Sequence, residues 1–356
     1  MKLGTYLEIN LKKIQENSSR ILELCRSMDI QVLGVTKGFT AKPRIVRAMI
    51  AGGIESLADS RLENIKMLRD RGFKQSMTLL RIPRLSAVDM VVEYTDCSVN
   101  SEYSVIKGLS DEALSRGKKH DVVLMVDVGD LREGVLPEDA LEMAKDIAML
   151  KGVRLCGIGT NMGCFGGVLP TMRNLNLLME VAGEIEKRLG IKLEVISGGG
   201  TSSLQLVERG QMPKGINQLR IGEGLLLGTD TTHGRTISWL HQDAFLAKTE
   251  VIELKVKPSK PIGETGRDSF GKIPSLVDKG LRKRAIVALG KQDVNVDGLI
   301  PIDPNMHVLG GSSDHMIIDV TDVDENIEVG DQLTFKLNYQ GLLFLCNSRY
   351  VKKVYV

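Results

Sequence analysis

The sequence predicts an α/β fold in which a (β/α)8 TIM-like barrel is followed by a mostly antiparallel β domain. Up to Asp230, short apolar runs alternate with amphipathic stretches at helical spacing, the pattern of a (β/α)8 barrel. Beyond that point helical periodicity nearly disappears, and strand-like runs are separated by turn residues. A length of 356 residues suits a barrel with a second domain. We therefore predict a barrel over residues 1–231 and a β domain over residues 232–356.

The individual elements follow from the same patterns, beginning with a helix from Ile9 to Leu24. The predicted barrel strands are 32–36, 54–57, 77–80, 97–99, 122–126, 155–158, 193–196 and 218–221. Helical patterns between them lie at 43–51, 61–71, 102–116, 137–150 and 175–189. Strands of the second domain are expected at 245–256, 285–289, 306–309, 316–320, 332–337 and 342–345.

Composition limits the classes of function. Hydrophobic residues make up 42% and charged residues 26%, which is typical of a globular protein. A net charge of +2 offers no case for binding nucleic acid or membranes. No apolar run approaches the roughly 20 residues that span a bilayer, and the N-terminal residues are predicted to be structural instead of a secretion signal. The five cysteines are scattered without a CxxC pair, so we expect reduced thiols, no metal site and a cytoplasmic location.

Lys37 is the first candidate for chemistry, because it directly follows the predicted strand 32–36. Active sites of (β/α)8 barrels lie at the carboxyl ends of the strands. Desolvation at such a mouth favours the neutral amine, which is the nucleophilic form of lysine. The alternative is a surface lysine at the start of a loop.

Two later strand ends predict an anion-binding loop. Gly198-Gly199-Gly200-Thr201-Ser202-Ser203 offers backbone N–H groups and hydroxyls at the start of a helix, although a flexible turn is the alternative. Gly222, which follows the last barrel strand, permits close backbone approach to a phosphate. Phosphate sites built from the loops after strands seven and eight recur in such barrels.

These groups together describe a pocket for pyridoxal 5'-phosphate (PLP). Lys37 would bind the cofactor covalently, and the glycine and serine loop would hold the phosphate. Arg220, at the end of the last barrel strand, would leave a nearby pyridine nitrogen unprotonated and weaken the ring as an electron sink. Arg132 lies in a glycine-bounded loop after the fifth strand, where its forked guanidinium group suits the carboxylate of a ligand. The alternative is a salt bridge within a surface loop.

The chain resembles the alanine racemase-like, fold type III PLP enzymes across both domains. Val35-Thr36-Lys37-Gly38 resembles the cofactor-lysine strand, and Thr5–Leu11 resembles the opening strand of that family. Similar family segments are Leu219–Gly228 and Asn347–Val351. The stretch Lys260–Gly271 is most similar to the ornithine racemase branch.

The resemblance implies roles for several residues. Arg220 would contact the pyridine nitrogen, and Arg132 would reach the phenolic oxygen of the cofactor and the substrate carboxylate. Thr201, Ser202, Gly222 and Tyr350 would bind the phosphate, and the loop with Ser313 and Asp314 would help to hold the substrate carboxylate. The resemblance also implies a homodimer with shared active sites.

Several positions depart from alanine racemase. The run after the lysine is Gly38-Phe39-Thr40-Ala41, the expected histidine after strand six is Asn161, and Met125 replaces a lysine that some members carbamylate. Ser313 replaces a methionine, which suggests room for a substrate larger than alanine. In the family the second catalytic base is a tyrosine, and Lys291 occupies the nearest position in this sequence. Asp293 and Tyr339 are rival candidates for this second base.

The sequence therefore predicts a PLP-dependent racemase of a basic amino acid, with ornithine as the first choice. The alternatives are a racemase of alanine or of broad specificity, a decarboxylase of the same fold, and a non-catalytic PLP carrier. A basic side chain would need a carboxylate partner, for which the candidates are Asp268, Asp293 and Asp314.

Overall fold

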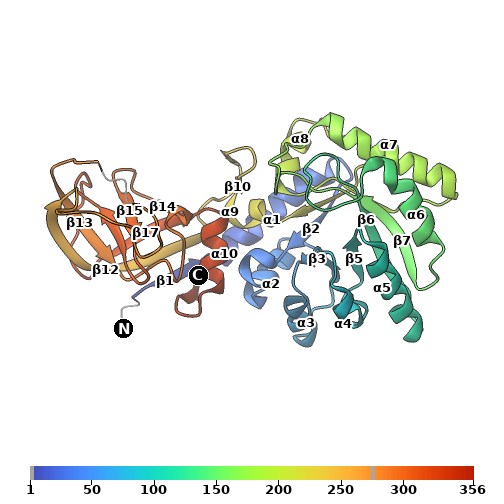
Figure 1. The fold of residues 1–356 in the computed structure, drawn as a ribbon, viewed down its shortest axis with the longest axis horizontal. Helices are drawn as coiled ribbons and strands as arrows, with labels where there is room; N and C mark the ends of the chain where they lie inside the picture. Colours follow the sequence, from blue (N-terminus) through green and yellow to red (C-terminus); the bar gives the residue numbers. More distant parts are fainter. Residues whose placement is uncertain (1–3, 274–276) are drawn as a thin grey trace. The chain divides into compact units, whose positions relative to one another are not determined.

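The computed structural model describes residues 4–273 and 277–356. It consists of two compact units (Figure 1). One unit is Leu11–His241, and the other combines Met1–Asn10 with Gln242–Val356. The boundary expected at 231/232 therefore differs from the observed division, and the first ten residues belong to the second unit.

The larger unit is a closed barrel of eight strands in the order β2 to β9. Neighbouring strands run parallel, including β2 with β9, which closes the ring. The strands are β2 (Gln31–Val35), β3 (Ser56–Asp59), β4 (Ser76–Leu79), β5 (Cys97–Asn100), β6 (His120–Met125), β7 (Val153–Gly159), β8 (Val195–Ser197) and β9 (Gln218–Ile221). All eight coincide with predicted strands to within a few residues, so the predicted barrel is confirmed.

Helices connect the strands and form the outer layer of the barrel (Figure 1). They are α1 (Leu11–Arg26), α2 (Pro43–Ala51), α3 (Leu62–Asp70), α4 (Val88–Tyr94), α5 (Tyr103–Ser115), α6 (Ala140–Ala148), α7 (Met172–Leu189), α8 (Leu204–Glu208) and α9 (Glu223–Leu227). The helix expected from Ile9 begins only at Leu11, because the preceding residues pair as a strand of the other unit.

Apolar side chains fill the barrel. One buried group combines Val99, Val123, Met125 and Cys156, and Leu80 packs against it. Leu80 also packs against a second group formed by residues of β2 and β3. Packing in layers of this kind makes the barrel a core and not a pore, so chemistry is confined to its mouth.

The smaller unit is built on an eight-stranded sheet. The long strand β12 (Phe245–Pro258) pairs antiparallel with β1 (Tyr6–Ile9), β13 (Leu281–Val287) and β17 (Gln332–Leu337). The remaining strands of the sheet are β14 (Leu299–Pro301), β15 (His307–Gly311), β16 (Met316–Asp319) and β18 (Lys352–Tyr355). The β1–β18 pair is parallel, and the mostly antiparallel β domain is confirmed.

One predicted strand is wrong. Residues 342–345 belong to the helix α10 (Tyr339–Asn347). The Asn338 side chain caps this helix by accepting a hydrogen bond from the backbone N–H of Gly341 at 2.9 Å. A four-residue apolar run does not by itself distinguish a buried strand from a buried helix turn.

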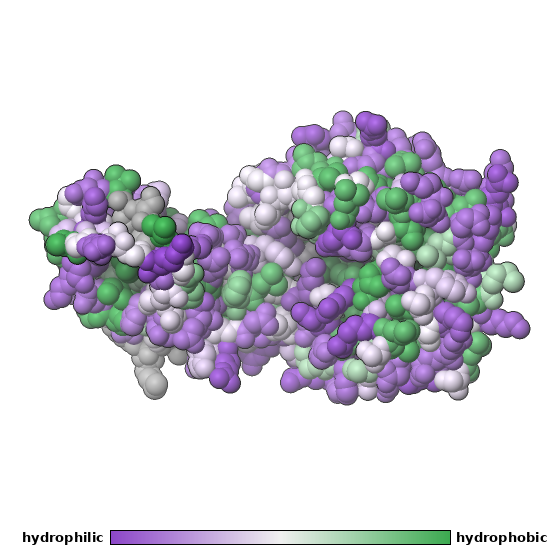
Figure 2. All heavy atoms as spheres, in the orientation of Figure 1, coloured by the Kyte–Doolittle hydropathy of each residue, from purple (hydrophilic) through white to green (hydrophobic). Residues whose placement is uncertain are grey.

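Hydrophilic side chains cover much of the visible face of each unit, with smaller apolar areas among them (Figure 2). Among residues 4–273 and 277–356, no helix has the length and apolar character needed to cross a membrane.

Candidate active site

Lys37 lies at the mouth of the barrel, two residues beyond the end of β2. Gly34 lets this strand pack closely, because a Cβ there would lie 2.6 Å from the Met49 side chain of α2. After the lysine, Thr40 and Ala41 both adopt positive φ angles of 53° and 47°. Left-handed backbone is costly for residues other than glycine. The structure thus turns the chain sharply just after Lys37.

Burial lowers the pKa of Lys37, and the nearby Arg132 guanidinium lowers it further. Cys164, Asp59 and Glu133 act in the opposite direction, and their influence is smaller than that of burial. The net effect favours the neutral amine, as the sequence predicts for a nucleophilic lysine.

Asp59 lies at the end of β3, next to the Lys37 strand, and sequence reasoning did not identify it. Its carboxylate accepts hydrogen bonds from the Thr36 hydroxyl at 2.5 Å, from the backbone N–H of Arg61 at 2.8 Å and from the Asn64 amide. Burial raises its pKa, although these hydrogen bonds act against that rise. Asp59 thereby links the residue before Lys37 to the start of the next helix, α3. Its place as the last residue of a barrel strand is the signal that could have found it.

Arg220 is buried in the barrel at the end of β9. Its guanidinium donates to the Ser197 hydroxyl and to the backbone carbonyl of Thr160. Both acceptors are neutral, and burial lowers the pKa of Arg220 to about 10. Across the described part of the chain, no carboxylate forms an ion pair with this arginine. The arrangement fits a cation that donates to a neutral acceptor, such as an unprotonated pyridine nitrogen.

The predicted phosphate loop is held between β8 and β9. Gly199 adopts a φ of +105°, and its carbonyl accepts a hydrogen bond from the backbone N–H of Arg220 at 2.9 Å. The Thr201 hydroxyl accepts from the backbone N–H of Gly224 at 3.2 Å, which joins the loops after the two strands. Ser202 is only 6% exposed. A Cβ at Gly222 would lie 3.2 Å from that of Val35, so glycine keeps this loop close to the Lys37 strand.

Arg132 belongs to a loop that is held by two carboxylates. Asp127 accepts the backbone N–H groups of Gly129, Leu131 and Arg132. Asp130 accepts four backbone N–H groups from the loop after β7, at residues 163, 164, 165 and 168. Burial raises the pKa of Asp130, but these four hydrogen bonds outweigh burial and lower it. The two loops therefore form one rigid side of the barrel mouth.

The Arg132 side chain itself pairs with Glu133. Burial alone would lower the pKa of Arg132, yet the hydrogen bond with Glu133 raises it overall. Asn161, which stands where the resemblance predicts a histidine, donates to the Cys164 thiol at 2.9 Å. Sequence reasoning did not identify Cys164, although it acts electrostatically on Lys37 and Arg132 alike.

The β unit gathers the other predicted residues into one patch. The Lys291 Nζ lies 3.6 Å from an Asp268 carboxylate oxygen and 4.0 Å from the centroid of the Phe270 ring. Its backbone N–H donates to Ser312, and that of Gln292 donates to Ser313 at 3.0 Å. Gly290 is required there, because a Cβ would lie 2.0 Å from the Ser313 carbonyl oxygen.

Asp314 and Tyr350 belong to the same patch. The Gln292 side chain donates to Asp314 at 3.0 Å, and the Ser348 hydroxyl donates to Asp293 at 2.6 Å. Tyr350 is 67% exposed, and its hydroxyl accepts a hydrogen bond from the Arg349 guanidinium at 3.0 Å. The segments that carry Lys291, Ser313, Asp314 and Tyr350 are thus joined by direct hydrogen bonds or by the residues next to them.

The barrel unit contains a desolvated lysine, a buried arginine with neutral acceptors and a glycine-rich loop between two strand ends. These features define the class of barrel enzymes that hold PLP on a lysine following the first strand. The residue types fit the cofactor, since a neutral amine suits its aldehyde, a buried arginine its ring nitrogen and a glycine-rich loop its phosphate.

Comparisons with known proteins place the chain within that class. The family described as alanine racemase, N-terminal domain, matches residues 9–230. The lysine racemase of Thermotoga maritima is 43% identical over 351 residues, covering 98% of each chain. The ornithine racemase of Acetoanaerobium sticklandii is 42% identical over 348 residues, also covering 98% of each chain.

Solved structures agree in fold. The alanine racemase of Clostridium difficile 630 superposes with a TM-score of 0.75 at 19% identity, over 100% of this chain and 96% of that one. The alanine racemase of Bartonella henselae, solved with covalently bound pyridoxal phosphate, gives 0.76 at 16% identity over 100% of both chains. The chain belongs to the alanine racemase family. It is a PLP-dependent amino-acid racemase, as the sequence predicts.

Proposed function

We propose that the enzyme interconverts the L and D enantiomers of a basic amino acid, with ornithine as the preferred substrate. The observation that supports this most is the similarity over 98% of the chain to proteins named lysine racemase and ornithine racemase. Ser313, which is small and polar, and the carboxylates of Asp268, Asp293 and Asp314 suit a substrate longer and more basic than alanine.

The cofactor, when bound, supplies the electron-accepting ring that makes the α-proton of an amino acid removable. We assign its covalent attachment to Lys37, whose lowered pKa supports a neutral amine. Arg220 would donate to the ring nitrogen, and Thr201, Ser202, Gly222 and Tyr350 would hold the phosphate. Arg132 would bind the substrate carboxylate, with Ser313 and Asp314 completing that part of the site.

Racemisation needs a proton-transfer group on each face of the α-carbon. Lys37 serves one face, and we assign the other to Lys291. The contact with Asp268 and Phe270 supports this assignment, because both restrict the Lys291 ammonium to one position. Asp293 and Tyr339 remain the alternative bases. The Ser348 hydroxyl donates to Asp293 at 2.6 Å.

We further propose a homodimer in which the β unit of one subunit completes the barrel site of the other. Most of the candidate substrate-binding residues lie in the β unit, whereas Lys37 and the phosphate loop lie in the barrel. Mixing Lys37→Ala subunits with Lys291→Ala subunits should then restore part of the activity. A monomer in sedimentation, or no complementation, would contradict the shared site.

A cytoplasmic location is part of the same proposal. The five cysteines are free thiols, and none is paired with another. Reduced cysteines are the rule in the cytoplasm and the exception in secreted proteins.

The decisive test of function is chiral chromatography of a panel of L-amino acids after incubation with enzyme and PLP in D2O. We expect ornithine to racemise fastest and to incorporate deuterium at the α-carbon, with lysine next. Faster turnover of alanine or serine would contradict the basic specificity. Release of CO2 would indicate a decarboxylase, and no exchange at all would indicate a PLP carrier.

A further inference from the structure

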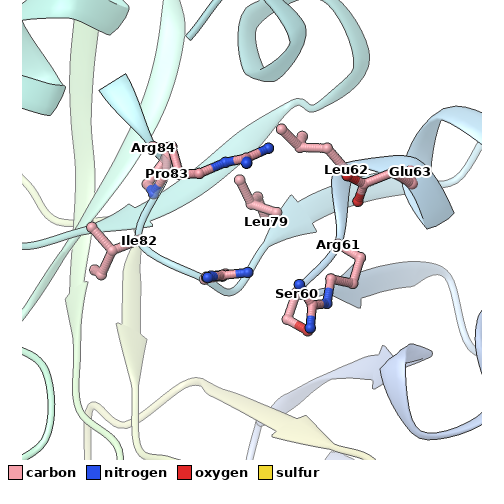
Figure 3. Close-up of a pocket in the computed structure, with 9 residues that line it drawn as sticks. Ser60, Arg61, Leu62, Glu63, Leu79, Ile82, Pro83 and Arg84 are labelled. Carbon is pink, nitrogen blue, oxygen red and sulfur yellow. The ribbon is translucent and has the colours of Figure 1, made fainter. Parts of the chain in front are cut away.

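Three arginines line a small cavity at the carboxyl ends of β3 and β4, and none of its lining residues is assigned to the cofactor. The cavity holds about 80 Å³ and is lined by nine residues, among them Arg61, Arg81 and Arg84 (Figure 3). The three arginines are exposed, so the space suits a charged group and its hydration.

The strand ends place the arginines around this cavity. The backbone N–H of Leu80 donates to the carbonyl of Asp59 at 2.8 Å, so the β3–β4 pairing continues to the edge of the barrel. Arg61 and Arg81 follow directly beyond that edge. Pro83 is buried, and Arg84 after it is extended with φ −75° and ψ 138°. In Figure 3 the Arg84 side chain extends toward Leu62 and Glu63 at the start of α3.

Among residues 4–273 and 277–356, none of the three guanidinium groups has an ion-pair or hydrogen-bond partner. Two other arginines of this unit have carboxylate partners: Arg69 pairs with Asp96, and Arg154 pairs with Asp121 and Glu194. Unpaired like charges around one cavity repel each other, and repulsion of this kind is relieved by a bound counterion.

Other groups at the cavity also favour an anion. Ser60 lines it and offers a hydroxyl. The first turn of α3 faces the same space, and no side chain caps that nine-residue helix. Its first backbone N–H groups have no partner within the helix, and the helix dipole adds positive potential there. Glu63 is the carboxylate among the nine lining residues. Asp59 does not line the cavity, and its carboxylate accepts hydrogen bonds from the backbone N–H of Arg61 and from the Asn64 amide.

We propose that this cavity, here called the arginine pocket, binds the phosphate group of a small molecule as a second anion site beside the cofactor site. Three guanidinium charges against one lining carboxylate leave a surplus of two positive charges. A phosphate monoester carries about −1.5 to −2 at neutral pH and matches this surplus, whereas a single carboxylate does not. Planar guanidinium forks bind phosphate oxygens in pairs.

The test is calorimetric titration of the PLP-loaded enzyme with inorganic phosphate at low ionic strength, with acetate as the monoanion control. Loading with PLP keeps the titrated phosphate out of the cofactor loop. We expect phosphate to bind more tightly than acetate, and Arg81→Gln with Arg84→Gln to weaken it by roughly tenfold or more. Arg209→Gln, an exposed arginine far along the chain, is the matched control and should bind phosphate as the wild type does.

Other results would overturn the proposal. Equal affinity for phosphate and acetate would show that the surplus positive charge does not favour a dianion over a monoanion. Unchanged phosphate affinity in the double variant would place the ion elsewhere, and loss of binding in Ser202→Ala alone would place it in the cofactor loop. If the double variant fails to fold, Arg81→Gln and Arg84→Gln are titrated separately. Repeating the titration with glycerol phosphate distinguishes the free ion from an ester as the preferred ligand.

Discussion

Lys37 and Lys291 are both assigned to proton transfer, yet their surroundings differ. Lys37 lies at the barrel mouth, where burial lowers its pKa, and no carboxylate pairs with it directly among the described residues. Lys291 lies in the β unit, 3.6 Å from Asp268 and against the ring of Phe270. One lysine is controlled by desolvation, and the other is held by a counterion and an aromatic face.

The difference shows which parts of the molecule each lysine depends on. The environment of Lys37 is made by the closed barrel, whose strands are joined by backbone hydrogen bonds. The environment of Lys291 is made by exposed turns around Asp268 and Ser313. Substitutions in these turns should therefore change the environment of Lys291 and leave the environment of Lys37 unchanged.

The largest expected effect is that of Lys37→Ala. Racemisation should fall by about a thousandfold or more, since both covalent attachment and one proton-transfer group are lost. The visible absorbance of the bound cofactor should disappear, and borohydride reduction should no longer fix it to the chain. A reduced adduct on another lysine, found by peptide mass spectrometry, would show that Lys37 is not the attachment site.

Lys291→Ala should abolish racemisation but leave α-proton exchange of one enantiomer measurable, because Lys37 still serves its own face. Deuterium incorporation from D2O, followed separately for each enantiomer, measures this. Asp268→Asn is the matched variant: it keeps the lysine and removes its counterion, so both directions should remain. Wild-type exchange of both enantiomers in Lys291→Ala would leave Tyr339 or Asp293 as the base.

His120 extends the comparison to a second group that is controlled by burial. It is 3% exposed, bonded to the Ser98 hydroxyl at 2.9 Å, and burial lowers its pKa to about 4. The unfolded chain, with a histidine pKa near 6.5, binds more protons below that pH. Stability is therefore full above about pH 6.5 and falls by about 3 kcal/mol as the pH drops to about 4.

Denaturant unfolding at a series of pH values measures this loss. In wild type the free energy of unfolding should decrease between about pH 6.5 and pH 4, in part because of His120. In His120→Gln this contribution to the pH dependence should be absent, whatever the absolute stability of the variant. An unchanged slope would show that the histidine is not protonated on unfolding.

Ser202→Ala tests phosphate binding by the barrel unit, and Tyr350→Phe tests phosphate binding by the β unit. Each should weaken PLP binding by roughly ten- to a hundredfold, which is the value of a charge-assisted hydrogen bond. Equilibrium dialysis of the cofactor measures the affinity, and melting of the cofactor-free protein is the control. An effect of Ser202→Ala alone would mean that the barrel holds the phosphate without the β unit.

The smallest expected effect is a shift in the pH dependence of amine labelling. In the cofactor-free protein Lys37 should react with an acylating reagent at lower pH than Lys66, because only the neutral amine reacts. Burial lowers the pKa of Lys37, and the hydrogen bond to Asp70 raises the pKa of Lys66. Arg132→Gln should move the Lys37 curve to higher pH, since the guanidinium lowers that pKa. Coincident curves for the two lysines would contradict the desolvation of Lys37.

The barrel was determined by local patterns in the sequence. Each strand is a short apolar run, and each run is followed by a turn or a capping residue, so all eight strands and the place of Lys37 could be predicted. The glycine and serine loop could also be predicted from the sequence, because its glycine, threonine and serine residues are consecutive.

Only the tertiary structure decided which side chains meet. Residues 342–345 form a helix because Asn338 caps it, whereas the four apolar residues alone also suit a strand. The contacts of Asp59 with Thr36 and of Lys291 with Asp268 join residues that are far apart in the chain, and Arg81 lines the same cavity as the start of α3. Patterns of hydrophobicity report the direction of a side chain within its own element, and they carry no information about a partner many residues away.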